Sequence, residues 1–334
     1  MTTLKYTMSG YRSLLSYSHQ RHLLVEGADD KRAFSLFLDE LFERLAPAGI
    51  ESVRIDSAQD LIECDEAGNR QKVEMVCESV SGKPYAERIV GFVDREFREF
   101  DRHPDLADSV KGHRISDRLI WSRGHSIENY YFDFDTLRSP LREFSVIDRF
   151  RDALALFKAV FATTIRLACA ASLAGDEIGM LSLVKGSVGR DVLEVDNSEE
   201  PLLTLNLGAW RSNLMARLKA SEGIAERLTD RFQYWCARVE EADFHVVRWM
   251  CHGHIGLAFI WAVYSRCVLE VCQRHGRRET DAEADARRVL KAEESVRFNA
   301  CAARWVERSL GDHCSFPIQV FELLGLDLLS QDDV

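Results

Sequence analysis

Short apolar runs alternate with segments of helical periodicity over the first 135 or so residues. Four runs read as strands: 22–25 (HLLV), 52–55 (SVRI), 88–93 (RIVGFV) and 118–121 (RLIW). After the first run, apolar residues recur at helical spacing from Ala33 to Leu45, where Pro47 and Gly49 are expected to end a helix. Residues 71–80 fit a second helix. Strands separated by helices are typical of βαβ units, so the sequence predicts an α/β fold with a parallel sheet flanked by helices.

The pattern changes at about residue 145, where long helical periodicities take over. The expected helices are 146–174, 209–220, 224–239, 256–275 and 281–305. Residues 191–203, rich in acids and bounded by apolar pairs, read as a loop or short hairpin. The sequence therefore predicts two domains, an α/β domain over 1–140 and a mainly helical domain over 141–334.

Composition places the chain among soluble globular proteins. It has 334 residues, of which 46% are hydrophobic and 29% charged, enough to bury one large core or two modest ones. No run of eighteen apolar residues occurs, and the N-terminal segment MTTLKYTMSGYR lacks an apolar signal-peptide core. Nine cysteines without a CxxC pair favour reduced thiols. We expect a cytoplasmic protein without a membrane partner.

The formal net charge of −11 argues against broad, non-specific binding of nucleic acid, because such binding needs many Lys and Arg side chains to displace counterions. A local basic groove stays compatible with this charge. A cluster of acids that holds divalent metal would also make the working charge less negative than the formal one.

Acids follow three of the four predicted strands. They are Glu26 with Asp30 after the first strand, Asp94 and Glu96 after the third, and Glu128, two residues after Ser126, after the fourth. Ligands gather at the carboxyl ends of parallel strands, and alternation along an extended segment would put Asp94 and Glu96 on one side. Each acid taken singly reads more simply as a solvated turn or a helix cap, the role expected for Asp29. Their conjunction predicts a site for Mg²⁺ or Mn²⁺.

These motifs resemble the TOPRIM domain, the Mg²⁺-dependent catalytic domain of topoisomerases, primases and OLD-type nucleases. VEGADD (25–30) is similar to its glutamate motif, and GFVDRE (91–96) to its later DxD motif. Glu26, Asp30 and Asp94 match the pattern, whereas Glu96 departs from it because the second aspartate is a glutamate. The resemblance implies a Rossmann-like fold and phosphodiester chemistry.

A narrower resemblance rests on HSIENYYF (125–132). Ser126-x-Glu128 is similar to the Ser-x-Glu of OLD-type nucleases, and the whole chain resembles the TOPRIM effector subunits of PARIS anti-phage defence systems. That resemblance implies an ABC-type ATPase partner that holds the nuclease inactive, and release by a phage anti-restriction protein. It also implies an active homodimer that cleaves host tRNA and arrests growth.

The resemblance further implies two metal ions. Asp94 and Glu96 would hold one, Asp30 and Glu128 the other, with Ser126 as a minor ligand and Glu26 as ligand or general base. A basic residue near the scissile phosphate would complete the site, and Lys185, His252 and His254 are the candidates, of which we favour His254.

Two alternatives to an RNA nuclease stay open at this point. One is an OLD-type nuclease that acts on DNA, and the other is a catalytically inactive TOPRIM module that only binds. Two neighbouring features have simpler interpretations. The HGH at 252–254 is expected to start a helix rather than bind zinc, and the aromatic residues at 130–134 are expected to pack in the core rather than stack on bases.

Overall fold

The computed structural model describes residues 5–44, 50–62, 67–196, 198–309 and 317–326. It divides the chain into two compact units. Unit 1 comprises Met1–Arg95, Val110–Ile127 and Ala302–Val334, and unit 2 comprises Glu96–Ser109 and Glu128–Cys301. The domain boundary between residues 140 and 141, which was drawn from a change of sequence pattern, stays a prediction. Each of the two compact units is built from more than one segment, and these segments alternate along the chain.

Unit 1 is built on a five-stranded sheet in the order β3-β2-β5-β9-β8. The strands are β2 (Arg21–Val25), β3 (Val53–Ser57), β5 (Ile89–Val93), β8 (Arg114–Ser116) and β9 (Leu119–Trp121). The first four in the sheet order pair in parallel, which confirms the predicted α/β class. The edge strand β8 runs antiparallel to β9; it was not predicted, because its three residues are all exposed and carry no apolar pattern.

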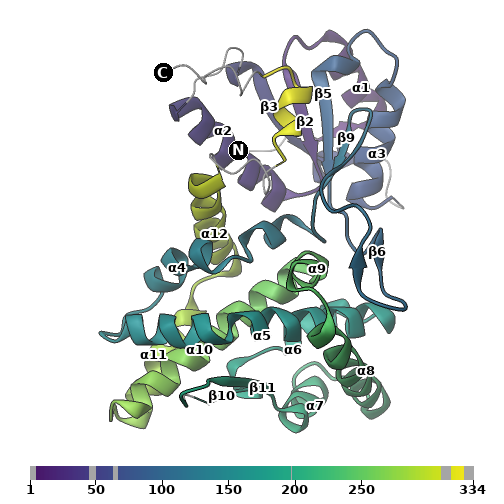
Figure 1. Cartoon of the computed structure of the whole chain (residues 1–334). Helices are drawn as coiled ribbons and strands as arrows, with labels where there is room; N and C mark the ends of the chain where they lie inside the picture. The colour runs from purple at the N-terminus through teal and green to yellow at the C-terminus, as the bar shows by residue number, and fades with distance from the viewer. Residues whose placement is uncertain (1–4, 45–49, 63–66, 197, 310–316, 327–334) are drawn as a thin grey trace. The chain divides into compact units, whose positions relative to one another are not determined.

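Helices cover both faces of this sheet (Figure 1). On one side lie α1 (Met8–Tyr17) and α3 (Asn69–Val80), whose apolar residues form a core with Leu24, Ile89 and Val93. On the other side lie α2 (Ala28–Arg44) and α13 (Gln319–Leu323). There the Phe34 ring lies 4.9 Å from the Phe92 ring, and Phe37 stacks on Phe321 at 5.6 Å. A C-terminal helix thus helps to bury the N-terminal sheet.

Short elements complete unit 1. They are the parallel pair β1 (Tyr6–Thr7) and β4 (Leu61–Ile62), and the 3₁₀ turns η1 (Ile50–Ser52), η2 (Ala58–Asp60) and η3 (Ala86–Arg88). The predicted end of α2 at Pro47 and Gly49 lies outside the described residues.

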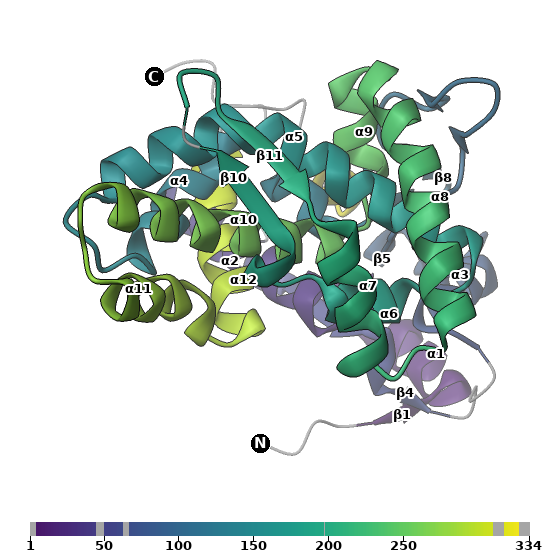
Figure 2. The ribbon, with the colours of Figure 1, turned by 90° about the horizontal axis from the view of Figure 1, so that it is seen from below.

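Unit 2 is helical and is centred on α5 (Phe150–Glu177) and α10 (Gly253–Arg274), which pack on each other. Around them lie α4 (Phe134–Glu143), α6 (Leu181–Ser187), α7 (Leu207–Ala216), α8 (Glu222–Glu241), α9 (Phe244–Met250) and α11 (Glu279–Lys291). The hairpin of β10 (Leu193–Asp196) and β11 (Leu202–Leu205) packs against the two central helices (Figure 2). This confirms the hairpin interpretation of 191–203. A second antiparallel pair joins β6 (Phe100–Asp101) and β7 (Ala107–Asp108).

One predicted helix is wrong in its extent. The stretch 281–305 is split into α11 and α12 (Glu294–Ser309), because Ala292 takes an extended conformation with ψ of 144°. No glycine or proline marks the break, so the residue pattern carried no signal for it.

Two helices, α5 and α10, are long and apolar enough to cross a membrane by length and composition alone. Their most apolar windows are 61% and 83% buried inside the protein. This burial is that of core helices in a soluble protein, and the cytoplasmic location stays a prediction.

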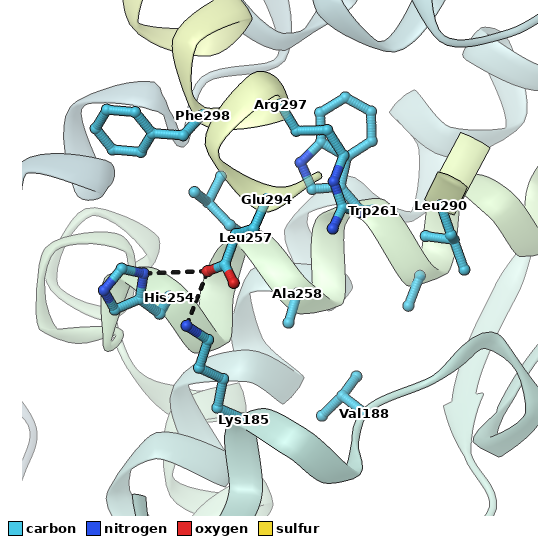
Figure 3. A pocket seen from close by; sticks show the side chains of 11 residues that line it. Lys185, Val188, His254, Leu257, Ala258, Trp261, Leu290, Glu294, Arg297 and Phe298 are labelled. Carbon is cyan, nitrogen blue, oxygen red and sulfur yellow. Dashed lines mark ion pairs between the residues drawn. The ribbon is translucent and has the colours of Figure 1, made fainter. Parts of the chain in front are cut away.

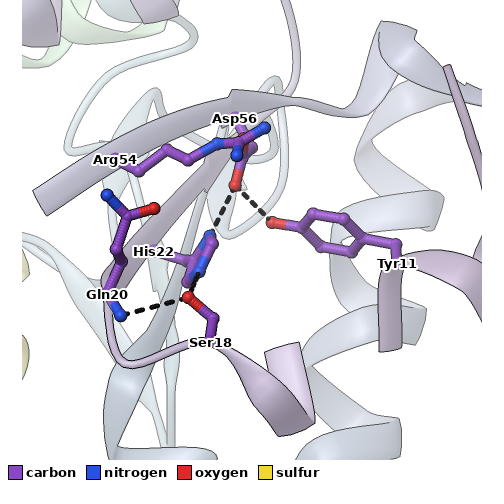
Figure 4. A network of polar contacts seen from close by, with 6 residues as sticks. All are labelled: Tyr11, Ser18, Gln20, His22, Arg54 and Asp56. Atoms are coloured by element: carbon purple, nitrogen blue, oxygen red, sulfur yellow. Dashed lines mark hydrogen bonds and ion pairs between the residues drawn. The ribbon is translucent and has the colours of Figure 1, made fainter. Parts of the chain in front are cut away.

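A buried polar network holds α1 against the sheet of unit 1 (Figure 4). The Asp56 carboxylate accepts from His22 Nδ1 at 2.7 Å, from the Tyr11 hydroxyl at 2.8 Å and from Arg54 Nε at 2.7 Å. His22 Nε2 lies 2.9 Å from Ser18 Oγ. Ser18, His22 and Asp56 thus have the connectivity of a hydrolytic triad, but His22 is fully buried in a strand and Asp56 serves three donors. The arrangement therefore fixes structure.

The Asp56 carboxylate should stabilise unit 1 in a pH-dependent way. Burial by itself would raise the pKa of Asp56, but the contacts with His22, Arg54 and Tyr11 outweigh burial, and the net pKa is lowered. A lowered folded pKa gives stability that is present above the ordinary carboxyl range, about pH 4, and that is lost as the pH falls through the folded value. We expect Asp56→Asn to lower the free energy of unfolding at pH 7 by about 2–4 kcal/mol. Urea unfolding of both proteins should show this difference shrinking below about pH 4, and a difference that grows in acid would contradict the assignment.

Candidate functional site

Two of the predicted acids lie at neighbouring strand ends in unit 1. Glu26 directly follows β2 and Asp94 directly follows β5, and these strands pair in parallel with Val25 opposite Phe92. The backbone N–H of Asp94 donates to Glu26 Oε1 at 2.7 Å. The structure therefore brings Glu26 and Asp94 together, and this hydrogen bond orients the Glu26 carboxylate along the carboxyl edge of the sheet.

Asp30 lies in the first turn of α2 and is buried, with 7% of its surface exposed. Its Oδ2 accepts from the Gly27 N–H at 3.0 Å, while the Gly27 carbonyl accepts the first helical bond, from Lys31, at 3.1 Å. The Asp30 bond to the Gly27 N–H corresponds to one half of a capping box, because Gly27 has no side chain to accept from the Asp30 N–H. The sequence predicts capping by Asp29, whereas the structure gives this hydrogen bond to Asp30, so one Asp30 oxygen already serves the helix.

The expectation that Asp94 and Glu96 alternate along one extended segment is wrong. Strand β5 ends at Val93, and Glu96 is exposed with a φ of 54°, in the left-handed region. A non-glycine residue there costs about 1–2 kcal/mol, and the chain leaves the extended conformation at Glu96, where a turn over residues 96–99 begins. Glu96 belongs to unit 2, and its role as a metal ligand stays a prediction.

Arg95, between these two acids, was missed by sequence reasoning. Its side chain is fully buried in unit 1, where one guanidinium nitrogen donates to the Arg123 carbonyl at 3.1 Å. Its backbone N–H donates to Ser122 Oγ at 2.9 Å, and Ser122 Oγ donates to the Gly124 carbonyl at 2.6 Å. Arg95 thus ties the turn after β5 to the loop after β9, the loop that carries the buried Ser126. The only signal in the sequence is a basic residue set between two acids.

The donor types in unit 1 fit a hard divalent cation, although the geometry is incomplete. Among the residues that the structure describes, no three His, Cys, Asp or Glu side chains are grouped closely enough to hold a metal ion. Mg²⁺ in enzymes of phosphate chemistry is commonly held by one or two carboxylates, with water and substrate phosphates supplying the other ligands. Glu26 and Asp94 are the pair that would hold it.

The remaining predicted acid lies in a polar cluster of unit 2. Glu128, in the turn η4 (Ile127–Tyr131), has 3% of its side chain exposed, and its Oε1 lies 3.0 Å from His254 Nδ1. The same His254 nitrogen lies 3.4 Å from Glu294 Oε1, and Lys185 Nζ lies 2.9 Å from that oxygen. Figure 3 shows His254 and Lys185 both directed at Glu294. Of the basic candidates, His254 contacts Glu128 directly. Lys185 is connected to His254 through Glu294, a residue that sequence reasoning missed.

Burial and neighbouring charges set the protonation of this cluster. Burial lowers the pKa of His252 to about 4, helped by His254 and Lys185 and opposed by Glu128, so His252 is neutral at pH 7. For Glu294, burial acts to raise the pKa, but the hydrogen bond and charge of Lys185 outweigh it and the pKa is lowered. Glu294 is therefore an anion at pH 7.

Asn129, the last residue of HSIEN, is tied to the turn between α9 and α10 within unit 2. Asn129 Nδ2 donates to the carbonyls of Arg248 and Cys251, each at 2.8 Å. Tyr130, Tyr131 and Phe132 are all buried, which confirms the predicted core role of these aromatics. His252 is the N-cap of α10, so the predicted helix start at HGH is also confirmed.

Comparison with known proteins gives no family for this chain. A scan against protein-family models finds no match, and no curated protein matches the sequence.

A matched pair of glycine substitutions tests how tightly the Glu128 turn is held. A Cβ at Gly256 would collide with the Phe132 ring, whereas a Cβ at Gly223 in α8 meets nothing within 4 Å. We expect Gly256→Ala to lower the free energy of unfolding by about 1–3 kcal/mol through overpacking. The control Gly223→Ala should raise it by up to about 1 kcal/mol, because alanine is the better helix former. Urea unfolding measures both, and equal effects would show that the Phe132 contact yields easily.

Proposed function

We propose that the chain is a metal-dependent nuclease of the TOPRIM type that cleaves RNA, tRNA being the expected substrate. The observation that carries the proposal is the pairing of Glu26 and Asp94 at adjacent carboxyl ends of parallel strands, joined by the 2.7 Å hydrogen bond between them. This is where α/β sheets bind ligands, and these are the residues on which the TOPRIM resemblance rests.

The proposed chemistry divides between the metal and the chain. Mg²⁺ or Mn²⁺, as one or two ions, would supply charge neutralisation and an activated water at the scissile phosphate. The Asp94 N–H fixes one oxygen of Glu26, and so holds the carboxylate that would act as ligand or general base at the carboxyl end of β2. Asp30 holds the first turn of α2 beside Glu26 through the Gly27 N–H.

In unit 2, the residues that the resemblance assigns to the nuclease include Glu128 and His254. Glu128 and His254 form a carboxylate–imidazole pair at 3.0 Å, an arrangement that sets which imidazole nitrogen carries the proton. By the same resemblance, unit 2 would serve an ABC-type ATPase partner that restrains the enzyme, and the released form would act as a homodimer in an anti-phage, growth-arresting system.

Two observations favour a second candidate, a TOPRIM module that binds without cleaving. Among the described residues, no three His, Cys, Asp or Glu side chains are grouped to hold a metal ion. One Asp30 oxygen also accepts the hydrogen bond that caps α2. In that case the acids would position a partner or a nucleic acid without catalysing hydrolysis.

Cleavage of total RNA and of plasmid DNA by the purified chain, with Mg²⁺ or Mn²⁺ and with EDTA, separates these candidates. We expect metal-dependent cutting of tRNA that falls at least about a hundredfold in Glu26→Gln, since that variant loses a ligand or base of the site. Glu43→Gln, an exposed residue at the end of α2, is the matched control and should cut at the wild-type rate.

The other outcomes reassign the function. Cutting of DNA alone favours the OLD-type DNA nuclease. If neither substrate is cut, even with the neighbouring ATPase and its trigger present, the binding module is the better account. RNA cutting that survives Glu26→Gln contradicts the proposed site.

A further inference from the structure

A pocket of about 260 Å³ lies within unit 2, between α6, α10, α11 and α12 (Figure 3). It is lined by Lys185, His254, Leu257, Trp261, Glu294 and Arg297, with smaller apolar contributions from the same helices. Its volume is near the lower end of the range of roughly 300–1,000 Å³ for ligand pockets, so it suits one small molecule.

The pocket has a charged side and an apolar side. Lys185 and Arg297 bring two positive charges and Glu294 one negative charge, while His254 is shared between Glu294 and Glu128. The apolar side is formed by Leu257, Trp261 and their neighbours on α10 and α11. Such a site fits a ligand with an anionic head and a flat, largely apolar body.

Two buried donors in this pocket lack acceptors. Trp261 has 2% of its surface exposed, and its Nε1–H has no hydrogen-bond partner in the part of the chain that the structure describes. The same holds for the Nε–H of Arg297, whose guanidinium lies 5.4 Å from the Trp261 ring. A buried donor without an acceptor costs about 1–3 kcal/mol. A ligand that carries acceptor atoms would recover this cost.

Glu294 occupies part of the place that an anionic ligand would take. Its carboxylate accepts from Lys185 and lies 3.4 Å from His254 Nδ1, and so provides in the chain the negative charge that a phosphate would provide. A dianionic phosphate would make more charge-assisted hydrogen bonds to Lys185 and Arg297 than one carboxylate makes.

We propose that this pocket binds a nucleoside monophosphate, free or as the phosphorylated end of an RNA, with the phosphate on Lys185 and Arg297 and the base beside Trp261. The base supplies carbonyl and ring-nitrogen acceptors for the buried donors. The pocket is formed by residues of unit 2 alone. Its lining includes His254 and Lys185, the candidates for the basic residue of the proposed nuclease, but binding of a monophosphate does not depend on that role.

Isothermal titration calorimetry of the full chain tests the site with UMP and AMP, with uridine and adenosine, with inorganic phosphate, and with a short 5′-phosphorylated RNA. We expect saturable binding of the monophosphates, and binding at least about tenfold weaker for the nucleosides and for phosphate alone. Tighter binding of the RNA than of the mononucleotides identifies an RNA end as the source, and the reverse identifies a free nucleotide; either supports the site.

Three variants locate the binding. Arg297→Gln should weaken it at least about tenfold. Glu294→Gln should tighten it severalfold, because it removes the competing anion, and a merely structural Glu294 would not give tighter binding. Arg287→Gln, an exposed arginine of α11 outside this pocket, is the matched control. Thermal melting of each variant checks that it is folded.

The proposal is overturned if neither wild type nor Glu294→Gln binds any monophosphate. It is also overturned if nucleosides without phosphate bind equally well, or if Arg287→Gln weakens binding as much as Arg297→Gln does.

Discussion

A parallel sheet has to be covered by helices on both faces, and unit 1 follows from that requirement. Its central strands β2 and β5 are buried along almost their whole length, so apolar helices must lie on each side. The connections between strands supply α2 and α3, and the N-terminus supplies α1. The face that carries Phe92 is completed by Phe321 and Trp305, which lie against Phe34 and Phe37 of α2. Trp305 and Phe321 are therefore part of the same core as the N-terminal strands.

Local patterns predicted the elements of this core well, and long-range packing explains what they missed. The run RIVGFV is short and rich in β-branched residues, which favours a buried strand over a helix, and all five residues of β5 are buried. Nothing local in QVFEL distinguishes a helix that packs on a distant sheet from one that packs on its neighbours. Likewise, the break at Ala292 has no glycine or proline, so its cause lies in packing that a sequence does not display.

The site was predicted unevenly for the same reason. The position of Glu26 beside Asp94 requires β2 and β5 to be neighbours in the sheet. Periodicity predicts both strands, whereas their pairing is given by the structure. The place of Glu96 depended on backbone dihedral angles beyond the strand, and its positive φ could not be read from the residue type. Arg95 and Glu294 were missed because a buried arginine and a bridging glutamate are defined by their partners, and those partners are distant in sequence.

In the pocket of unit 2, the ion pair between Glu294 and Lys185 neutralises part of the positive charge when no ligand is bound. Side chains of Lys185 and Glu294 are 37% and 51% exposed, and ion pairs of that exposure contribute about 0–1 kcal/mol. Such a pair is weak enough to be replaced by a more highly charged group. Buried pairs such as His22 with Asp56 are of the opposite kind, because separating them would leave an uncompensated charge in the core. The two pairs therefore differ in role because they differ in exposure. The buried pair His22–Asp56 fixes the fold, whereas the exposed pair Lys185–Glu294 is able to exchange partners.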